Sequence, residues 1–362
     1  MKHWNKITTA IALTSCMVFP AFASELKVFN WAEYMGEDTL ANFTKETGIE
    51  VVYDTYDSLE SMETKILTGG AGYDVVFAAG PVVERFVGAK LLQKLDQESL
   101  TNKGNLDASL MKVLAGHDPD NAHAIPYMWG TVGIAYNKAL IEKRMKDAPL
   151  NSLDIIFKPE ISAKFADCGI AILDSPGEVL NVALNYLGLD PTSSKKGDIK
   201  KAQELVTSIR PNIRYFNSVK PIDDLATGEI CMALMYSGDA GIAADAASNG
   251  GKGIEISYSI PKEGTMMWFD SMVIPTDAVN TKEAHQFIDY MMRPKVIAEI
   301  SNGIFYANAN TASLEFVDKD ITSDPNIFPP EDVRAKLFPD VALAKKSTRL
   351  RTRAWTKVKT GR

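Results

Sequence analysis

Three aromatic residues in this chain each stand two or three positions before an acidic residue. The pairs are Trp31 with Glu33, Tyr236 with Asp239, and Trp268 with Asp270. An aromatic ring covers a methylene chain and attracts a cation, while a carboxylate binds an ammonium group. The pairs therefore predict a site for a ligand with an aliphatic body and positively charged ends. For any single pair, the alternative is a core aromatic beside a surface acid.

Strands and helices alternate in the part of the chain that must position the first pair. Strands are predicted at 26–30, 49–53 and 73–77, with helices at 37–47 and 58–67. Repeated β-α-β units with short connections form a parallel sheet wrapped by helices, and ligands bind at the carboxyl ends of its strands. We therefore expect the site at the loops 31–34 and 79–81, which directly follow the first and third strands.

The middle of the chain predicts a second α/β lobe. It contains a strand at 169–173, a helix at 178–187 and a strand at 231–235. Two extended runs, 125–136 and 254–260, flank this part and are predicted to cross between the lobes. A strand at 272–275 and a helix up to residue 291 follow. Two lobes joined by crossing strands form a clamp that closes around a ligand.

The expected division is as follows. Lobe 1 comprises residues 24–131 and 259–305, and lobe 2 comprises residues 132–258 and 306–362.

The first 23 residues have the pattern of a secretory signal peptide. Lys2 and Lys6 precede an apolar stretch at 7–18, Pro20 follows it, and 21–23 is a small-x-small cleavage site. The predicted location is the periplasm, with the mature chain beginning at Ser24.

Two alternatives to a cleaved leader stay open. An uncleaved anchor is disfavoured, because the apolar stretch is shorter than the roughly 20 residues that span a bilayer. A lipoprotein box at 13–16 would leave Cys16 lipidated, although the tether after it would be apolar rather than polar.

The chain is acidic, with 39 Lys and Arg against 46 Asp and Glu, a net charge of -7. Removing Lys2 and Lys6 with the leader leaves 37 against 46, a net charge of -9. An acidic protein disfavours nucleic acid and anionic lipid as partners and suits a cationic ligand. Simple solubility is the alternative reason for such a charge.

Two cysteines remain after the leader, Cys168 and Cys231. An even pair in an exported protein predicts one disulfide, with two buried thiols as the alternative. The chain has no CxxC spacing and few histidines, so a zinc site is not expected. Hydrolase, P-loop and dinucleotide motifs are also absent, which disfavours an enzyme.

The carboxyl end is basic, with Lys and Arg at eight positions between 345 and 362. It predicts a helix whose charged face is in solvent and whose apolar side carries Leu350, Trp355 and Val358. An anion-binding arm is the alternative.

The mature sequence resembles the periplasmic putrescine-binding proteins of bacterial polyamine ABC transporters over nearly its whole length. The stretches that carry the resemblance are residues 30–34 (NWAEY), 117–121 (HDPDN), 126–129 (PYMW), 184–188 (LNYLG), 210–216 (RPNIRYF), 305–310 (FYANAN) and 353–359 (RAWTKVK). The resemblance implies a type II periplasmic-binding-protein fold, α/β with two lobes, a hinge of crossover strands and a ligand cleft between them.

The resemblance also implies which residues bind the ligand. The aromatic residues are Trp31, Tyr236, Trp268 and Tyr306, and the carboxylates are Glu33, Glu178, Asp239 and Asp270. Tyr34, in the loop after the first predicted strand, is a further expected ligand-binding residue. We expect Glu33 and Asp270 at one ammonium pole and Asp239 with Glu178 at the other. The family also places a disulfide between Cys168 and Cys231.

The sequence departs from the family pattern at several of these positions. Tyr236 replaces a tryptophan, Trp268 a phenylalanine, and Glu33 the usual aspartate; Ala32 and the loop 78–81 lack the hydroxyls found in the family. Each lost hydroxyl removes a contribution of about 1 kcal/mol in a buried site. The charged anchors are kept, so a diamine or polyamine ligand is still expected.

The expected function is capture of putrescine, or of spermidine or cadaverine, for delivery to an inner-membrane ABC permease. The protein is expected to act as a monomer, without cofactor or metal. The alternative is a periplasmic sensor that presents polyamine occupancy to a membrane signalling receptor.

Overall fold

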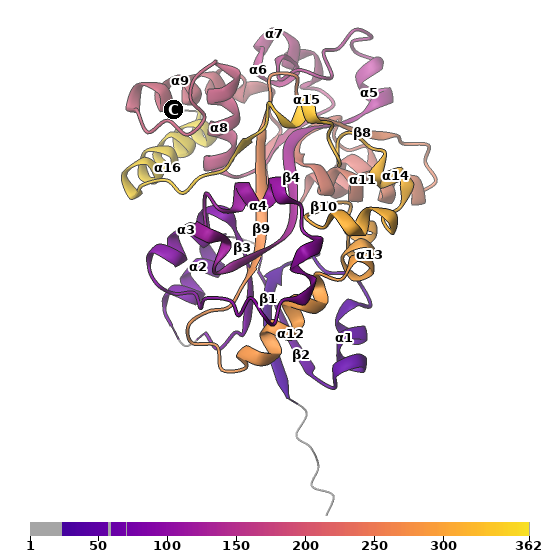
Figure 1. The fold of residues 1–362 in the computed structure, drawn as a ribbon. Helices are drawn as coiled ribbons and strands as arrows, with labels where there is room; N and C mark the ends of the chain where they lie inside the picture. Colours follow the sequence, from indigo (N-terminus) through magenta and orange to yellow (C-terminus); the bar gives the residue numbers. More distant parts are fainter. Residues whose placement is uncertain (1–23, 57–58, 70, 362) are drawn as a thin grey trace, which may run out of the picture.

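The computed structural model describes residues 24–56, 59–69 and 71–361, whose strands form one mixed sheet that runs through both halves of the molecule (Figure 1). The strands are β1 (Glu25–Trp31), β2 (Glu50–Tyr56), β3 (Val75–Ala79), β4 (Ala124–Asn137), β5 (Ile170–Ile172), β6 (Tyr215–Phe216), β7 (Met232–Tyr236), β8 (Ile256–Ser259), β9 (Met266–Val273), β10 (Ala307–Asn308) and β11 (Phe338–Pro339).

Helices cover both halves of this sheet. The α-helices are α1 (Thr39–Thr47), α2 (Leu59–Leu67), α3 (Gly80–Gly88), α4 (Ala108–Leu114), α5 (Lys138–Glu142), α6 (Asp154–Phe157), α7 (Pro159–Ser162), α8 (Pro176–Tyr186), α9 (Lys196–Ser208), α10 (Pro221–Thr227), α11 (Ser237–Asn249), α12 (Thr281–Met291), α13 (Pro294–Ile304), α14 (Lys319–Thr322), α15 (Glu331–Arg334) and α16 (Lys345–Thr360). Short 3-10 helices are η1 (Thr101–Asn105), η2 (Pro119–Asn121), η3 (Ala163–Phe165), η4 (Arg210–Asn212) and η5 (Thr311–Glu315).

The strand order is β2-β1-β3-β9-β4-β7-β5-β6, with β8 and β10 paired to β4 and β11 paired to β9. Strands β1, β2 and β3 are parallel, as are β5, β6 and β7, while β9 and β4 lie antiparallel to each other and to β3 and β7; β11 runs parallel to β9. The two parallel groups confirm the α/β prediction, because each group comes from alternating strands and helices.

Each half of the sheet has an apolar core on both faces. In β3, for example, Val75 and Phe77 belong to one core and Val76 and Ala78 to the other, because successive side chains point to opposite faces. In the other half, one core packs β5 and β7 against α8, α9 and α16, and the second packs them against α10 and α11. Each half of the sheet thus has its own buried apolar core, as a fold with two lobes requires.

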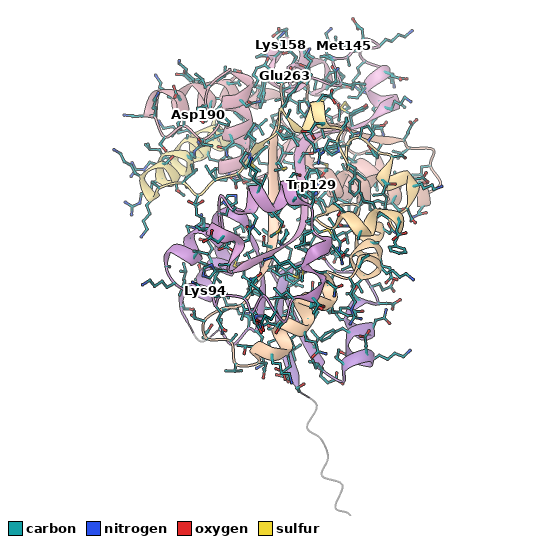
Figure 2. The ribbon with its side chains drawn as sticks, viewed as in Figure 1. Lys94, Trp129, Met145, Lys158, Asp190 and Glu263 are labelled. Atoms are coloured by element: carbon teal, nitrogen blue, oxygen red, sulfur yellow. A yellow bond between two sulfur atoms is a disulfide. The ribbon has the colours of Figure 1, made fainter. Side chains whose placement is uncertain are left out.

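Two strands join the lobes. Residues 124–131 of β4 pair with β9, and residues 132–137 pair with β7 and β8. β9 begins at Met266, in the core beside α8 and α16, and ends at Val273, in the core beside α3. Trp129 lies halfway along the molecule, between Lys94 in one lobe and Lys158 in the other (Figure 2).

The expected second crossing, at 254–260, is wrong. β8 pairs only with the distal half of β4, through residues 134–137, so it stays within one lobe. The crossing strand is β9, which begins at Met266 rather than at 272. Both stretches are extended and apolar in the sequence, and only strand pairing distinguishes them.

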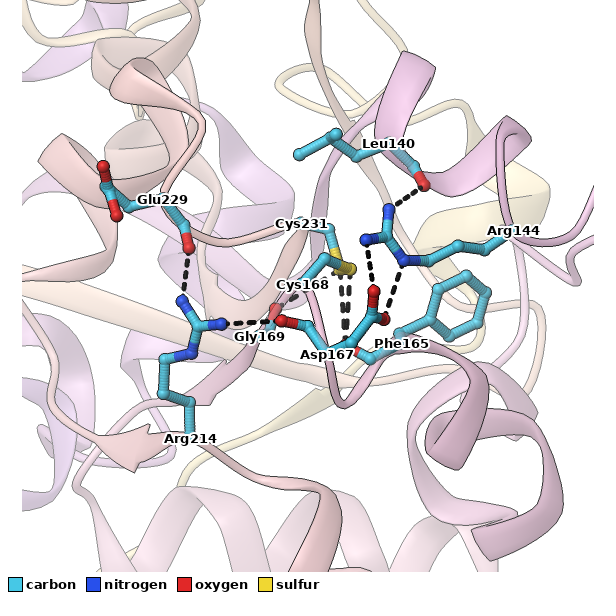
Figure 3. A network of polar contacts seen from close by, with 9 residues as sticks. All are labelled: Leu140, Arg144, Phe165, Asp167, Cys168, Gly169, Arg214, Glu229 and Cys231. Atoms are coloured by element: carbon cyan, nitrogen blue, oxygen red, sulfur yellow. Dashed lines mark hydrogen bonds and ion pairs between the residues drawn. A yellow bond between two sulfur atoms is a disulfide. The ribbon is translucent and has the colours of Figure 1, made fainter.

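Cys168 and Cys231 form a disulfide with their Cα atoms 5.5 Å apart, which confirms the predicted pairing. The bond joins the residues that precede β5 and β7 (Figure 3). Beside it, the Arg144 guanidinium donates two hydrogen bonds to the Asp167 carboxylate, at 2.8 and 2.6 Å. The cross-link therefore lies at the end of the sheet remote from the carboxyl ends of these strands.

The predicted leader, 1–23 with Cys16, lies outside the described residues, as does Ser58 at the expected start of the second helix. None of the described helices has both the length and the hydropathy needed to cross a membrane. The lobe boundaries stay a prediction. Residues after 305 make contacts on the side assigned to lobe 1, since β10 pairs with Met128 and Trp129 of β4.

Candidate ligand-binding site

Four aromatic rings from four separate elements meet where the two lobes face each other. Tyr34 follows β1, Tyr236 ends β7, Trp268 lies in β9, and Tyr306 precedes β10. The Trp268 ring centre lies 4.9 Å from that of Tyr306, 6.0 Å from Tyr236 and 6.4 Å from Tyr34. The structure thus brings together four of the five aromatic residues expected at the site, although the first and last of them are 272 positions apart in the sequence.

Two glycines allow these rings to approach the backbone. A Cβ atom at Gly130 would lie 2.5 Å from the Trp268 ring, and one at Gly238 would lie 2.3 Å from the Tyr306 ring. Real Cβ atoms essentially never approach that closely, so any larger residue would displace the ring. The enclosure of the site therefore depends on β4 and on the first turn of α11 as well as on the rings.

Asp270 provides the carboxylate at the end of the site nearest β1. It lies in β9 opposite Ala79 of β3 and is 5 % exposed. Burial raises its pKa to about 7; the Tyr34 hydroxyl and the Trp31 indole oppose the shift. Neither of those two groups has a hydrogen-bond partner of regular geometry among the described residues. Asp270 is thus surrounded by donors but not fixed by them.

Asp239 stands in the first turn of α11, in the other lobe. The Tyr306 hydroxyl donates a hydrogen bond to its Oδ1 atom at 2.9 Å. Burial raises the pKa of Asp239 to about 6, and the hydrogen bond from Tyr306 opposes that shift. The positive end of the helix dipole favours a carboxylate at this position. Tyr306 packs in the core of the first lobe, so this hydrogen bond connects the two lobes.

Glu178 occupies the first turn of α8. The Tyr236 hydroxyl donates to its Oε2 atom at 2.6 Å. Burial raises the pKa of Glu178 to about 7, and the charges of Asp340 and Asp270 raise it further, while Tyr236 and Ser175 oppose the shift. Two acids of the site therefore already influence each other across the lobes.

Asp340 is an acid of this site that the sequence analysis missed. It directly follows β11, and its backbone N–H donates to the Met267 carbonyl at 3.2 Å, beside Trp268. Burial raises its pKa to about 6; the Val341 N–H, Arg351 and Arg85 oppose the shift. A signal was present, because Phe338 precedes Asp340 with the same spacing as Trp268 and Asp270.

The charge of the site is not balanced by the protein. Among the described residues, no ion pair involves Glu178, Asp239 or Asp270, and no lysine or arginine is among the causes of their pKa shifts. A buried carboxylate without a cation is costly, so its ionised form needs a positive partner. One buried and two partly buried carboxylates around one set of rings favour a ligand with more than one positive charge.

Two of the expected ligand-binding residues, Trp31 and Glu33, lie at the margin of the cluster of four rings. Trp31 is partly buried, with its ring 4.5 Å from that of Tyr56, and its indole lies near Asp270. Glu33 is exposed and adopts a left-handed backbone conformation, with φ 54°. Its charge raises the pKa of Tyr53, but Glu33 is not among the groups that shift the pKa of Asp270. The contacts described here do not join Glu33 to the Asp270 pole.

The model of the bacterial extracellular solute-binding proteins matches residues 38–329 of the chain. The chain belongs to this family. Its members are extracellular solute-binding proteins.

The chain is similar over its full length to two curated relatives. It is 46% identical over 365 residues to the putrescine-binding periplasmic protein PotF of Escherichia coli, covering 100% of this chain and 99% of that one. It is 44% identical over 366 residues to the putrescine-binding periplasmic protein SpuD of Pseudomonas aeruginosa, with 100% of both chains covered. These similarities confirm the resemblance that the sequence motifs indicated.

A solved structure confirms the fold class. The putative spermidine/putrescine ABC transporter protein from Listeria monocytogenes superimposes with a TM-score of 0.83 at 31% identity, covering 94% of this chain and 100% of that one. The solute-binding protein thus has the type II periplasmic-binding-protein fold that the sequence predicted.

Proposed function

We propose that this protein captures putrescine or a related polyamine in the periplasm and delivers it to an inner-membrane ABC importer. The main support is a set of three carboxylates without a cationic partner among the described residues, the buried Asp270 and the partly buried Asp239 and Glu178, which surround an aromatic enclosure. A diamine supplies the missing charges at its ends and an apolar chain between them.

The proposed ligand-binding residues form two poles and a wall. Asp270 binds one ammonium group, and Asp239 with Glu178 binds the other. The wall consists of Trp31, Tyr34, Tyr236, Trp268 and Tyr306, whose rings cover the methylenes. Glu33 lies at the exposed margin after β1, where it attracts the cation without enclosing it.

Capture depends on closing the two lobes. The ligand gains contacts from both lobes only in the closed form, so its binding free energy shifts the population toward closure. The hydrogen bond from Tyr306 to Asp239 joins the lobes in the same way, and β4 and β9 are the connections that must bend. The closed form is the one that we expect an ABC permease to recognise.

The length of the ligand is expected to be selected by the separation of the poles. A shorter or longer diamine would leave one buried charge unpaired, which costs affinity. Asp340 adds a further acid whose charge acts on Glu178, which keeps the triamine spermidine among the candidates with putrescine and cadaverine.

Isothermal titration calorimetry of the purified mature protein tests this function. Putrescine, cadaverine and spermidine are titrated separately, with glutamate and glucose as an anionic and a neutral control. We expect saturable one-to-one binding of at least one amine and none of the controls. Binding of a control but of no amine would overturn the proposal.

Delivery and location need separate tests. In a strain lacking its own putrescine importers, uptake of labelled putrescine should require both this protein and its cognate permease. A sensor would instead bind putrescine without supporting uptake. The periplasmic fraction should contain a monomer whose measured mass corresponds to a chain that begins at Ser24. A lipidated Cys16 would instead place the protein in the membrane fraction.

A further inference from the structure

The carboxyl-terminal helix α16 buries an arginine against the lobe that carries Glu178. Arg351 is 1 % exposed, and its Nη1 atom donates to the Asn181 Oδ1 atom at 2.6 Å. Its Nη2 atom donates to the backbone carbonyls of Pro191 and Ser193, at 3.2 and 3.0 Å. The expectation that the basic residues of this helix face solvent is therefore wrong for Arg351. Its guanidinium instead joins α8 to the loop that follows α8.

The same helix holds the segment just before α8. The Trp355 indole N–H donates to the Asp174 Oδ1 atom at 2.7 Å, and the Lys359 Nζ atom donates to its Oδ2 atom at 2.6 Å. The Asp174 N–H in turn donates to the Ser218 hydroxyl at 3.1 Å. Both oxygens of one carboxylate are thus occupied by α16.

These two attachments lie on either side of Glu178. Asp174 stands four residues before it, and Asn181 stands three residues after it, which places Asn181 and Glu178 on the same side of α8. The Glu178 carboxylate receives the Tyr236 hydroxyl from β7 at 2.6 Å. Glu178 therefore lies on a short segment that α16 holds at both ends.

A purely stabilising role explains Arg351 poorly. Burying a guanidinium is costly, and its three hydrogen-bond partners are neutral oxygens, so the net gain in stability is small. Its planar fork can instead hold three acceptors in fixed relative positions, which a lysine cannot do. Arg351 also lowers the pKa of Asp340, the acid beside Glu178.

We propose that α16 is a positioning element of the ligand site, in which Arg351, Trp355 and Lys359 hold Glu178 at the distal ammonium pole. The inference rests on the proposed function, because it assigns a role in amine binding. None of the three side chains needs to touch the ligand. Their effect on affinity passes through the position of one carboxylate.

A double-mutant cycle separates positioning from general stability. Arg351→Lys and Asp174→Asn are each made in the wild-type chain and in the Glu178→Gln variant, and putrescine affinity is measured by calorimetry. We expect each change to weaken binding about fivefold when Glu178 is present and less than twofold when glutamine replaces it. Asp174→Asn keeps the side-chain volume at a partly exposed position and carries the test if Arg351→Lys does not fold.

Matched controls lie on the same helix. Arg353→Lys and Lys357→Met change exposed residues of α16 and should leave affinity within a factor of 1.5. Equal losses with and without Glu178, or no loss at all, would overturn the positioning role. Absence of amine binding by the wild-type protein would instead overturn the proposed function, and this inference with it.

Discussion

The two ends of the candidate site hold their carboxylates in different ways. Asp270 sits in the middle of β9, where it pairs with Ala79 of β3, and no side chain of the described residues fixes its carboxylate with a hydrogen bond of regular geometry. Asp239 and Glu178 each stand in the first turn of a helix and each receive a tyrosine hydroxyl. At the Asp270 end, strand pairing holds the backbone, but the carboxylate lacks a regular hydrogen bond from a side chain of the described residues. At the other end, the two carboxylates are already partly stabilised by tyrosine hydroxyls.

This difference predicts how the free energy of binding is divided. A carboxylate that already has a helix dipole and a hydrogen-bonded hydroxyl gains less from an ammonium group than one that is outside a helix terminus and whose neighbouring donors are not fixed to it. We therefore expect Asp270 to dominate affinity. The predictions below test that ranking, from the largest expected effect to the smallest.

Asp270→Asn should weaken putrescine binding about 100-fold, because the ammonium group would be buried without its charged partner. The same change should raise the melting temperature of the free protein at pH 7.5, since it removes an uncompensated buried carboxylate. Calorimetry and thermal unfolding measure the two effects. Asp320→Asn, an exposed carboxylate in α14, is the control. Wild-type affinity in Asp270→Asn would contradict the assignment of this pole.

Asp239→Asn should weaken binding about 30-fold, a smaller loss than that of Asp270→Asn. The amide still accepts the Tyr306 hydroxyl and keeps the contact between the lobes, but it no longer neutralises the ammonium group. The measurement is calorimetry at the same pH. If Asp239→Asn proved the more damaging of the two variants, the ranking of the poles would be reversed.

Gly238→Ala should weaken binding about tenfold without unfolding the protein. The new methyl group would lie 2.3 Å from the Tyr306 ring, so the ring must move away from Asp239 and Trp268. Gly303→Ala is the matched control, because it adds a methyl group to helix α13 in open space. Equal affinities of the two variants would show that the Tyr306 ring is not held as tightly as described.

Affinity should fall with decreasing pH. Glu178 and Asp270 both have a pKa of about 7 in the free protein, so an amine must displace their protons as the pH drops. We expect about a threefold loss between pH 7.5 and 6.5 for each carboxyl that must ionise, seen by calorimetry in buffers of different ionisation enthalpy. A pH-independent affinity without proton release would show that these carboxyls are ionised before binding.

The stability of the free protein should change in the opposite direction. A folded-state pKa above the unfolded value means that the folded chain binds more protons between about pH 4 and pH 7. The contribution of Glu178 and Asp270 to the free energy of unfolding is therefore present below that range and is lost as the pH rises through it. Asp270→Asn should flatten this part of the stability profile.

Glu33→Gln should change affinity less than threefold, because Glu33 is exposed and its charge is screened by solvent. The association rate at low ionic strength should fall more than the affinity does. Stopped-flow fluorescence from the tryptophans of the site can follow this rate. A loss of tenfold or more would place Glu33 at the Asp270 pole, as the sequence resemblance suggests.

Residues close together in the sequence were predicted well. Alternating strands and helices up to residue 79 gave β1 to β3 within a few positions, because hydrophobic periodicity and glycine stops act over short distances. The pairing of Cys168 with Cys231 followed from there being two cysteines in the predicted mature chain. The second crossing strand was not predictable in this way, since β8 and β9 have the same local pattern.

The expected chemistry of the ligand followed from the sequence alone, because aromatic residues paired with acids, an acidic composition and family motifs are all properties of residue type and order. Only the tertiary structure decided which carboxylates lose water, since burial depends on segments far apart in the chain. It brought Asp340 beside Glu178, left Glu33 in solvent and buried Arg351 under α8. The sequence alone identifies each acidic residue, but the free energy of its charged form depends on the groups that the folded chain places around it.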